Sequence, residues 1–403
     1  MPEAEDQRET NAAGRFDLVV RGGEVFDPDR RVFARADVAV RGGRVVGIAP
    51  SLPSGQAARE VDASGKVVCP GLIDSHVHVY PLGHLVGVDP DELASRSGVT
   101  AFVDAGSTGA LGFIGFRHYV LEPARSHVYA LLNVSAIGLA FEGVRGLEVQ
   151  EHDDLRLLHL TSAVEIVDRN RDRIVGIKVR MYNGLTSLAP VAAGRELADE
   201  VGLPLVVHAV QPPPSFRDIL PYLRAGDVVT HVFHPGPSAV VRTDGTIRDD
   251  YREAKARGVH IDSGSARLFT SFPVIKAALA AGFAPDSIST DLTTVTVDQL
   301  TIDLPNTLSK FLALGLSLPE VLYKATLGAA YLLPPEAGRG RLAVGGPADM
   351  AVLEVEGGSF QYRDFFGNEV ATDKRLACRA TILGGEVLAR REHTALPYTF
   401  IRR

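Results

Sequence analysis

The chain has 403 residues, of which 45% are hydrophobic and 23% are charged; this suits one large α/β barrel or two globular domains and excludes wholesale disorder. Its formal net charge of −7 gives no basic footprint for binding nucleic acid or an anionic membrane surface. Because only two cysteines are present, a disulfide framework and a CxxC zinc cluster are both excluded.

The amino-terminal end predicts a polar tail followed by short strands. Residues 1–14 are polar and lack the apolar core of a signal peptide, so we expect a disordered tail. The sequence has no run approaching about 20 apolar residues, and we therefore expect a cytoplasmic protein. From residue 15 to residue 69, alternating apolar residues separated by RGG and DASG turns indicate an antiparallel meander.

The middle of the chain alternates short apolar runs with helical patterns. Eight such runs occur, at residues 69–79, 98–106, 127–136, 173–181, 203–210, 227–234, 259–265 and 287–292. After the eighth run, Ser317 and Glu320 form a capping-box pattern that predicts the start of a helix. Eight strand–helix units predict an α/β fold, a (β/α)8 TIM barrel, for which about 250 residues are typical.

The carboxy-terminal end returns to strands and glycine turns, in the segments RLAVGGPADMAVLEV and RATILGGEVLARR. We therefore expect one small β-sandwich-like domain made from both termini, residues 15–69 plus 340–403, beside a barrel of residues 70–339. The alternative is a pair of unrelated β extensions, one at each end.

Metal-binding residue types gather at the carboxyl ends of the predicted barrel strands, where the active sites of TIM barrels lie. His76 and His78 are two residues apart on the first run, so both side chains point to the same face of that strand. His208 is near the end of the fifth run, His231 lies in the sixth, and Asp291 is near the end of the eighth. Imidazole and carboxylate ligands together suit a borderline metal ion such as zinc.

Lys178 lies inside the Val/Ile-rich fourth run, where a bare ammonium is costly because burial favours the neutral amine. Two arrangements meet this cost. The lysine either pairs with a carboxylate, or its neutral amine takes up carbon dioxide to form a carbamate. A carbamate is an anion with two oxygens that can bridge two cations, and the nearby histidines and aspartate favour it.

The strand ends PGLIDSHVH, GIKVR, VVHA, THVFH and STDL occur in this order on the eight units. In this the chain resembles the amidohydrolase superfamily, in particular its binuclear members with a carboxylated lysine. GVTAFVDAGSTG, VHAVQPPPS and DLPNTLSKFLALGLSLPEVLYKAT resemble the amidohydrolase/deacetylase metallohydrolase subgroup, which is dihydroorotase-like. The segment GRGRLAVGGPADMAVLEV is similar to the one that follows the barrel in those enzymes.

The resemblance implies two divalent metal ions, with zinc favoured and manganese or iron also compatible. It assigns six ligands, namely His76, His78 and Asp291 on the more buried ion, His208 and His231 on the second, and the carbamate of Lys178 bridging both. A hydroxide would bridge the ions on the other side and attack the substrate. Asp291 would take the proton of this hydroxide and pass it to the leaving nitrogen or oxygen.

Four further residues are candidates for substrate binding. Arg180 is two residues beyond Lys178 and so can share its face of the strand. It would either bind a substrate carboxylate through two hydrogen bonds or form an ion pair at the barrel mouth. Tyr182 continues the same alternation, and Ser107 and Thr108 follow the second run in a sequence that is also common in ordinary turns.

The expected function is hydrolysis of an N-acyl amide or O-acyl ester of a small molecule, a deacetylase-like activity. The alternative is hydrolysis of a cyclic amide, as in dihydroorotase or hydantoinase. A non-catalytic scaffold, as among dihydropyrimidinase-related proteins, would have lost metal ligands, whereas all six positions are filled. We expect a small-molecule substrate, no nucleic-acid or membrane partner, and a homo-oligomer as in the family.

Overall fold

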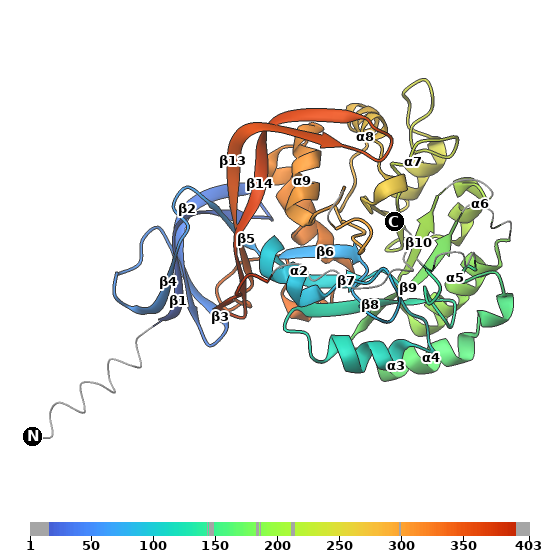
Figure 1. Cartoon of the computed structure of the whole chain (residues 1–403), viewed down its shortest axis with the longest axis horizontal. Coiled ribbons are helices and arrows are strands. Elements are labelled where there is room, and N and C mark those ends of the chain that lie inside the picture. The colour runs from blue at the N-terminus through green and yellow to red at the C-terminus, as the bar shows by residue number, and fades with distance from the viewer. Residues whose placement is uncertain are drawn as a thin grey trace, which may run out of the picture.

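The computed structural model describes residues 16–142, 144, 149–182, 185, 187–210, 214–297 and 300–391. The tail expected at residues 1–14 lies outside these residues. Within them, the chain forms one sheet of eight strands and one of seven, which lie side by side in Figure 1.

The eight-stranded sheet, called the terminal sheet below, joins the two ends of the chain. Its strand order is β15–β14–β13–β5–β1–β2–β3, and β4 also pairs with β1. The strands are β1 Phe16–Asp27, β2 Val32–Arg41, β3 Arg44–Ala49, β4 Ala57–Asp62, β5 Val67–Pro70, β13 Met350–Arg363, β14 Glu369–Leu383 and β15 Glu386–Val387. Buried side chains from both ends, such as Leu18, Val38 and Val352, form one apolar core. This confirms the predicted β structure shared by both termini, while the exact domain boundaries stay a prediction.

The expected meander is only partly antiparallel. β1, β2 and β3 pair in antiparallel order, but β4 and β5 run parallel to β1. Since β2 occupies one edge of β1, the chain returning from β3 pairs along the other edge of β1. The register of β1 shifts between Val20 and Gly23, and β5 then continues the sheet by pairing with β13 in antiparallel order.

The seven-stranded sheet curls into a barrel of parallel strands in sequential order. The strands are β6 Leu72–Val77, β7 Val99–Asp104, β8 His127–Asn133, β9 Ile174–Met181, β10 Leu205–Ala209, β11 Val228–Thr230 and β12 His260–Asp262. The eighth predicted run closes the barrel through isolated parallel bridges, Asp262 with Ser287 and Val77 with Leu292. It is not a continuous strand, because Asp291 has a φ of 48°, outside the extended region. The predicted (β/α)8 TIM barrel is confirmed.

Helices cover the outside of the barrel; in Figure 1, α3 and α4 lie along its lower side and α5 lies on its right. The described helices are α2 Pro90–Ser97, α3 Phe113–Phe116, α4 Leu160–Arg169, α5 Ala189–Val201, α6 Phe216–Ile219, α7 Asp249–Ala256, α8 Phe272–Ala280, α9 Leu304–Ala313 and α10 Leu318–Lys324. The predicted capping box is present at the start of α10, where the Ser317 N–H donates to Glu320 Oε2 at 2.8 Å.

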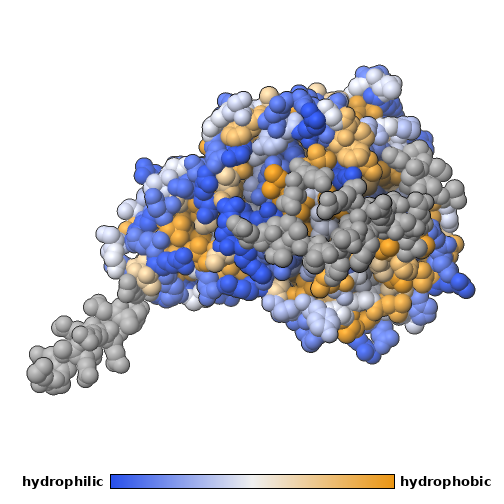
Figure 2. Space-filling view, in the orientation of Figure 1, coloured by the Kyte–Doolittle hydropathy of each residue, from blue (hydrophilic) through white to orange (hydrophobic). Residues whose placement is uncertain are grey.

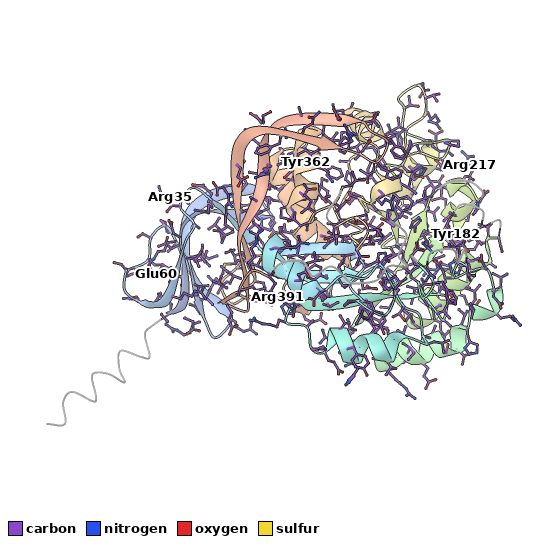
Figure 3. The ribbon with its side chains drawn as sticks, viewed as in Figure 1. Arg35, Glu60, Tyr182, Arg217, Tyr362 and Arg391 are labelled. Carbon is purple, nitrogen blue, oxygen red and sulfur yellow. The ribbon has the colours of Figure 1, made fainter. Side chains whose placement is uncertain are left out.

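The β13–β14 hairpin leaves the terminal sheet and reaches across to the barrel. Figure 1 shows its far end beside α8, and Figure 3 shows Tyr362 of β13 over α9. At the tip, the backbone N–H of Phe272, the first residue of α8, donates to Asp364 Oδ2 at 2.9 Å. The backbone N–H of Leu376 on β14 donates to the Ser309 hydroxyl oxygen of α9 at 2.8 Å. The Asp364 contact ties the hairpin tip to the end of the barrel where the carboxyl ends of its strands lie. The Leu376 contact ties the body of the hairpin to α9.

The surface mixes polar and apolar side chains. Figure 2 shows both kinds interspersed on the visible face, with many hydrophilic residues over the terminal sheet. Among the described residues, no helix has the length and apolar character needed to cross a membrane.

Candidate active site

His76 and His78 lie at the carboxyl end of β6, and both Nε2 atoms face the same aspartate. His76 Nε2 is 3.5 Å and His78 Nε2 is 3.3 Å from Asp291 Oδ1. The spacing of two residues on one strand therefore does bring the two imidazoles to one point, as the sequence predicted. Asp291 is held there by its own backbone N–H, which donates to the His76 carbonyl at 2.7 Å.

His208 and His231 come from the next part of the barrel. Their ring centroids are 4.2 Å apart, and His231 Nε2 is 3.8 Å from Asp291 Oδ2. His231 and Asp291 both have a positive φ, of 68° and 48°, which costs on the order of 1–3 kcal/mol for a residue other than glycine. The left-handed backbone thus occurs at two positions whose side chains meet.

Lys178 is buried on β9 with its Nζ 3.3 Å from His76 Nε2. Burial lowers the pKa of this lysine to about 8, although the nearby Asp291 carboxylate acts to raise it. The neutral amine is therefore accessible near physiological pH. Gly106 makes the close approach of the neighbouring loop possible. A Cβ at Gly106 would lie 2.7 Å from Lys178 Cβ and Cγ, and its φ is +85°.

Three of the four histidines, His76, His78 and His231, are oriented in the same way. In each, a hydrogen bond at Nδ1 fixes the ring proton on that nitrogen. The Ser107 hydroxyl donates to Asp104 at 2.7 Å, so it accepts from His78 Nδ1 at 2.9 Å. The Thr230 hydroxyl donates to Asp262 at 2.9 Å and accepts from His76 Nδ1 at 3.1 Å. A hydroxyl has one proton to give, which leaves the Nε2 lone pair of each histidine directed at the cluster.

His231 completes this pattern through a backbone oxygen. Its Nδ1 donates to the Gly264 carbonyl at 2.8 Å. Its Nε2 is buried and has no hydrogen-bond partner among the described residues. A buried acceptor without a partner is costly in a protein alone, and it is the atom that a metal ion would take. Burial also lowers the pKa of His76, His208 and His231, which keeps the imidazoles in the neutral form that binds metals.

Asp262, which the sequence reasoning did not single out, supports the cluster from behind. Besides Thr230, its carboxylate accepts from the hydroxyls of Ser287 at 2.6 Å and Ser289 at 2.7 Å, and Oδ2 lies 3.5 Å from His76 Nδ1. Such outer-shell carboxylates fix the tautomer and orientation of metal-binding histidines. The only sequence signal was its position within the seventh predicted run, residues 259–265.

The donor set fits a metal ion. One ligand atom each from His76, His231 and Asp291 lies within 4.8 Å of the others, in the part of the chain that the structure describes. Neutral imidazoles with a carboxylate are a donor set suited to zinc and neighbouring divalent ions. All six predicted metal ligands gather in this region, because His78, Lys178 and His208 line the same cavity.

The cavity has a volume of about 210 Å³. It is lined by His76, His78, Val86, Ala105, Asn133, Leu139, Glu142, Lys178, Arg180, His208, Ala266, Arg267, Leu268, Phe269, Asp291, Thr293, Val295 and Thr296. Much of this wall comes from the loops after β12 and after the eighth run. No residue of those loops was predicted as a site residue, because such loops follow no periodic pattern.

Arg180 lines the cavity but is already paired with carboxylates of its own chain. Its Nε and Nη2 donate to the two oxygens of Glu151, and its Nη1 donates to Glu142 at 3.0 Å. Burial opposes ionisation of Glu151, yet Arg180 holds the pKa of that carboxyl below its usual range. Of the two arrangements considered for Arg180, the structure has the ion pair at the barrel mouth.

The other three substrate candidates are not among the described residues that line the cavity. Ser107 lies behind His78 as described above, and the Thr108 hydroxyl donates to the Gly109 carbonyl at 3.1 Å. The Tyr182 hydroxyl donates to Asp153 at 3.2 Å, and its ring stacks on His152. Figure 3 shows Tyr182 beyond the end of β9, toward α6. A role for these residues in substrate binding stays a prediction.

The Arg180–Glu151 pair gives a first quantitative expectation. Arg180→Met leaves the Glu151 carboxylate, which is 1% exposed, without its partner, and the loss of one partner of a buried pair typically costs about 3–5 kcal/mol of stability. We expect urea unfolding at pH 7 to show a loss of that size. Arg169→Met, which removes an exposed pair with Glu165 on α4, is the control and should cost only about 0.5 kcal/mol. Equal stability of the two variants would contradict the buried pair.

A parallel barrel with buried histidines and an aspartate at the carboxyl ends of its strands has its candidate site where enzymes of the TIM-barrel class have their active sites. The chain belongs to the Amidohydrolase family, which matches residues 67–386. It is 31% identical to a deacetylase of Agrobacterium fabrum over 88% of this chain and 86% of the relative. It is 27% identical to a deacetylase of Enterococcus faecalis over 92% of this chain and 99% of the relative.

Solved structures agree with this family. A dihydroorotase crystal structure superposes with a TM-score of 0.84 and 28% identity, covering 92% of this chain and 99% of the other. An adenine deaminase crystal structure has the same TM-score and coverage with 26% identity. Both structures thus match this chain over nearly its whole length with one fold.

Proposed function

We propose that this enzyme is a metal-dependent hydrolase that cleaves an N-acyl amide or O-acyl ester of a small molecule, with a deacetylase-like activity. Six residues would hold two divalent ions, namely His76, His78, Lys178 as its carbamate, His208, His231 and Asp291. Zinc is the favoured ion and manganese or iron is compatible. When bound, such ions lower the pKa of a coordinated water and polarise a carbonyl oxygen.

The proposal rests on one observation above all, the convergence of Nε2 lone pairs on Asp291. Three histidines have their Nδ1 protons engaged outward, and the Nε2 atoms of the same residues lie 3.3–3.8 Å from Asp291 oxygens. The protein therefore supplies a preformed cation site on the floor of a substrate-sized cavity.

Asp291 is the residue that we assign to proton transfer. Its carboxylate lies on the cavity wall, and although burial opposes its ionisation, its pKa lies below the usual range. It is thus ionised at neutral pH, and it would accept a proton from the attacking water and pass it to the leaving nitrogen or oxygen.

The acyclic acyl substrate is favoured by the two relatives described above at 31% and 27% identity, since both are named deacetylases. A second candidate is hydrolysis of a cyclic amide, which the dihydroorotase neighbour supports. A cytoplasmic location and assembly as a homo-oligomer belong to the same proposal. The substrate is expected to be a small molecule, because the cavity is about 210 Å³.

A substrate panel with metal analysis tests the proposal. Purified enzyme is expected to hold two metal equivalents per chain, to release acetate from N-acetyl amino acids or acetyl esters, and to lose this activity after chelation. Dihydroorotate and hydantoin are the comparison substrates. Faster ring opening of either cyclic amide would favour the second candidate, and absence of bound metal with no hydrolysis of any compound would contradict both.

A further inference from the structure

Two arginines line the cavity, and they differ in what they already bind. Arg180 donates from Nε, Nη1 and Nη2 to Glu142, Gln150 and Glu151. Arg267 has no hydrogen-bond or ion-pair partner among the residues that the structure describes. Apart from the candidate metal ligands, Arg267 is therefore the cationic side chain of the described cavity wall whose N–H groups are still available to bind an anion.

Arg267 is held close to the candidate metal site by its own short turn. It begins the 3-10 turn η4, Arg267–Phe269, which follows β12. The ring of Phe269 ends this turn and packs on the rings of His208 and His231, with centroids 4.8 Å and 4.6 Å apart. Arg267 itself lines the cavity, and its turn is packed through Phe269 against two of the candidate ligands.

The hairpin of the terminal sheet supplies a platform for this guanidinium. Arg267 Cζ lies 5.1 Å from the centroid of the Phe365 ring at the β13–β14 tip. Asp364 fixes the tip to the start of α8, as described above. An aromatic ring that covers one face of a guanidinium stabilises it and leaves the N–H groups at its edge free for an anion.

The remaining wall is largely apolar around this cation. Its apolar members from the loops are Val86, Leu139, Leu268, Phe269 and Val295, and Leu268 is 47% exposed at the rim. The Arg180 side of the cavity carries the Glu142 and Glu151 carboxylates, so it disfavours a second anion there. One available arginine beside apolar walls suits a carboxylate with an apolar substituent, because a phosphate dianion would need more donors.

We propose that Arg267 binds a carboxylate of the substrate and selects acyl compounds that carry a carboxylate and an apolar group. This inference rests on the proposed function and names its substrate class. Phe365 is a positioning residue that holds Arg267 and does not touch the substrate. The hairpin of the terminal sheet would thereby contribute to specificity at the barrel mouth.

The test compares racemic N-acetylleucine with racemic N-acetylleucinamide, which share the acetamide bond and side chain and differ in the carboxylate. With metal-loaded enzyme, we expect wild type to prefer the carboxylate. Arg267→Met should lower kcat/KM for N-acetylleucine by about 10- to 100-fold, the range for lost charge-assisted hydrogen bonds, and leave N-acetylleucinamide nearly unchanged. Phe365→Leu should raise KM for N-acetylleucine alone, by about 2- to 5-fold, with kcat unchanged.

Arg217→Met is the matched control, since Arg217 is an exposed arginine of α6 outside the cavity wall (Figure 3). It should alter neither substrate. An equal loss on both substrates in Arg267→Met, or a preference for the carboxylate that survives this substitution, would overturn the assignment. If wild type releases acetate from neither compound, nor from the acetyl esters and other N-acetyl amino acids of the panel above, the proposed function is contradicted. Calorimetric binding of both compounds to the Asp291→Asn enzyme, with and without Arg267→Met, then decides the role of Arg267 by itself.

Discussion

Asp291→Asn is expected to lower kcat by about 10²–10⁴-fold, the contribution of a positioned general acid–base group, with the fold retained. The amide has the shape of the carboxylate but cannot accept a proton at neutral pH. Oδ1 of the native residue faces both His76 and His78, and Oδ2 faces His231, so one substitution alters the group that all three approach. The measurement is the steady-state rate of acetate release, with circular dichroism to verify the fold.

Asp262→Asn is the matched control for this substitution. Asp262 is equally buried and lies on the opposite, Nδ1 side of His76, where it orients the ring without facing the cavity. Loss of such a supporting carboxylate typically costs 10- to 100-fold in metal affinity or activity, and excess metal should restore the activity that this variant loses. Activity of Asp291→Asn should stay low at every metal concentration. Near-full turnover by Asp291→Asn would contradict its assigned role.

The barrel was predictable because its strands are buried on both faces and therefore read as apolar runs. For the eighth run, which closes the barrel, the position was predictable but the path of the backbone was not. The eighth run pairs with its neighbours at Ser287 and Leu292, but its backbone turns aside at Asp291, whose positive φ leaves no trace in an apolar pattern. The parallel pairing of β4 and β5 with β1 was missed for another reason. Local alternation identifies a strand but not the edge with which it pairs.

The site residues likewise divide into those that local spacing predicts and those that it does not. His76 and His78 were found because a spacing of two on a strand puts both side chains on one face. Asp262 and Arg267 contact residues distant in sequence, namely His76 and Phe365, and no local spacing encodes such contacts. Arg180 had the right position for a carboxylate site, but its partner Glu151 lies in a loop 29 residues earlier that only the folded chain brings to it.

The final expectation concerns Lys178, for which two roles were considered. A lysine that only forms an ion pair would take no part in turnover, so its replacement by an apolar residue would lower the stability of the fold without lowering the activity of the folded enzyme. Replacement of a lysine that carries a carbamate would remove activity as well, because the carbamate would be a ligand of the two ions. The structure has the amine buried, with its pKa lowered to about 8 by that burial, and next to His76 Nε2 at 3.3 Å.

We therefore expect Lys178→Met to lower kcat/KM by roughly 10³-fold or more, comparable to the loss of an essential catalytic group, together with a loss of bound metal. Lys178→Ala should be as inactive, but it leaves space beside Gly106, whose absent Cβ already lets the lysine pass. A short carboxylate such as propionate, added at high concentration, can then occupy this space and supply two oxygens in place of the carbamate. Partial recovery of metal content and turnover in Lys178→Ala, with none in Lys178→Met where the space is filled, is the expected result. Near wild-type activity of Lys178→Met would instead identify the lysine as an ion-pair partner.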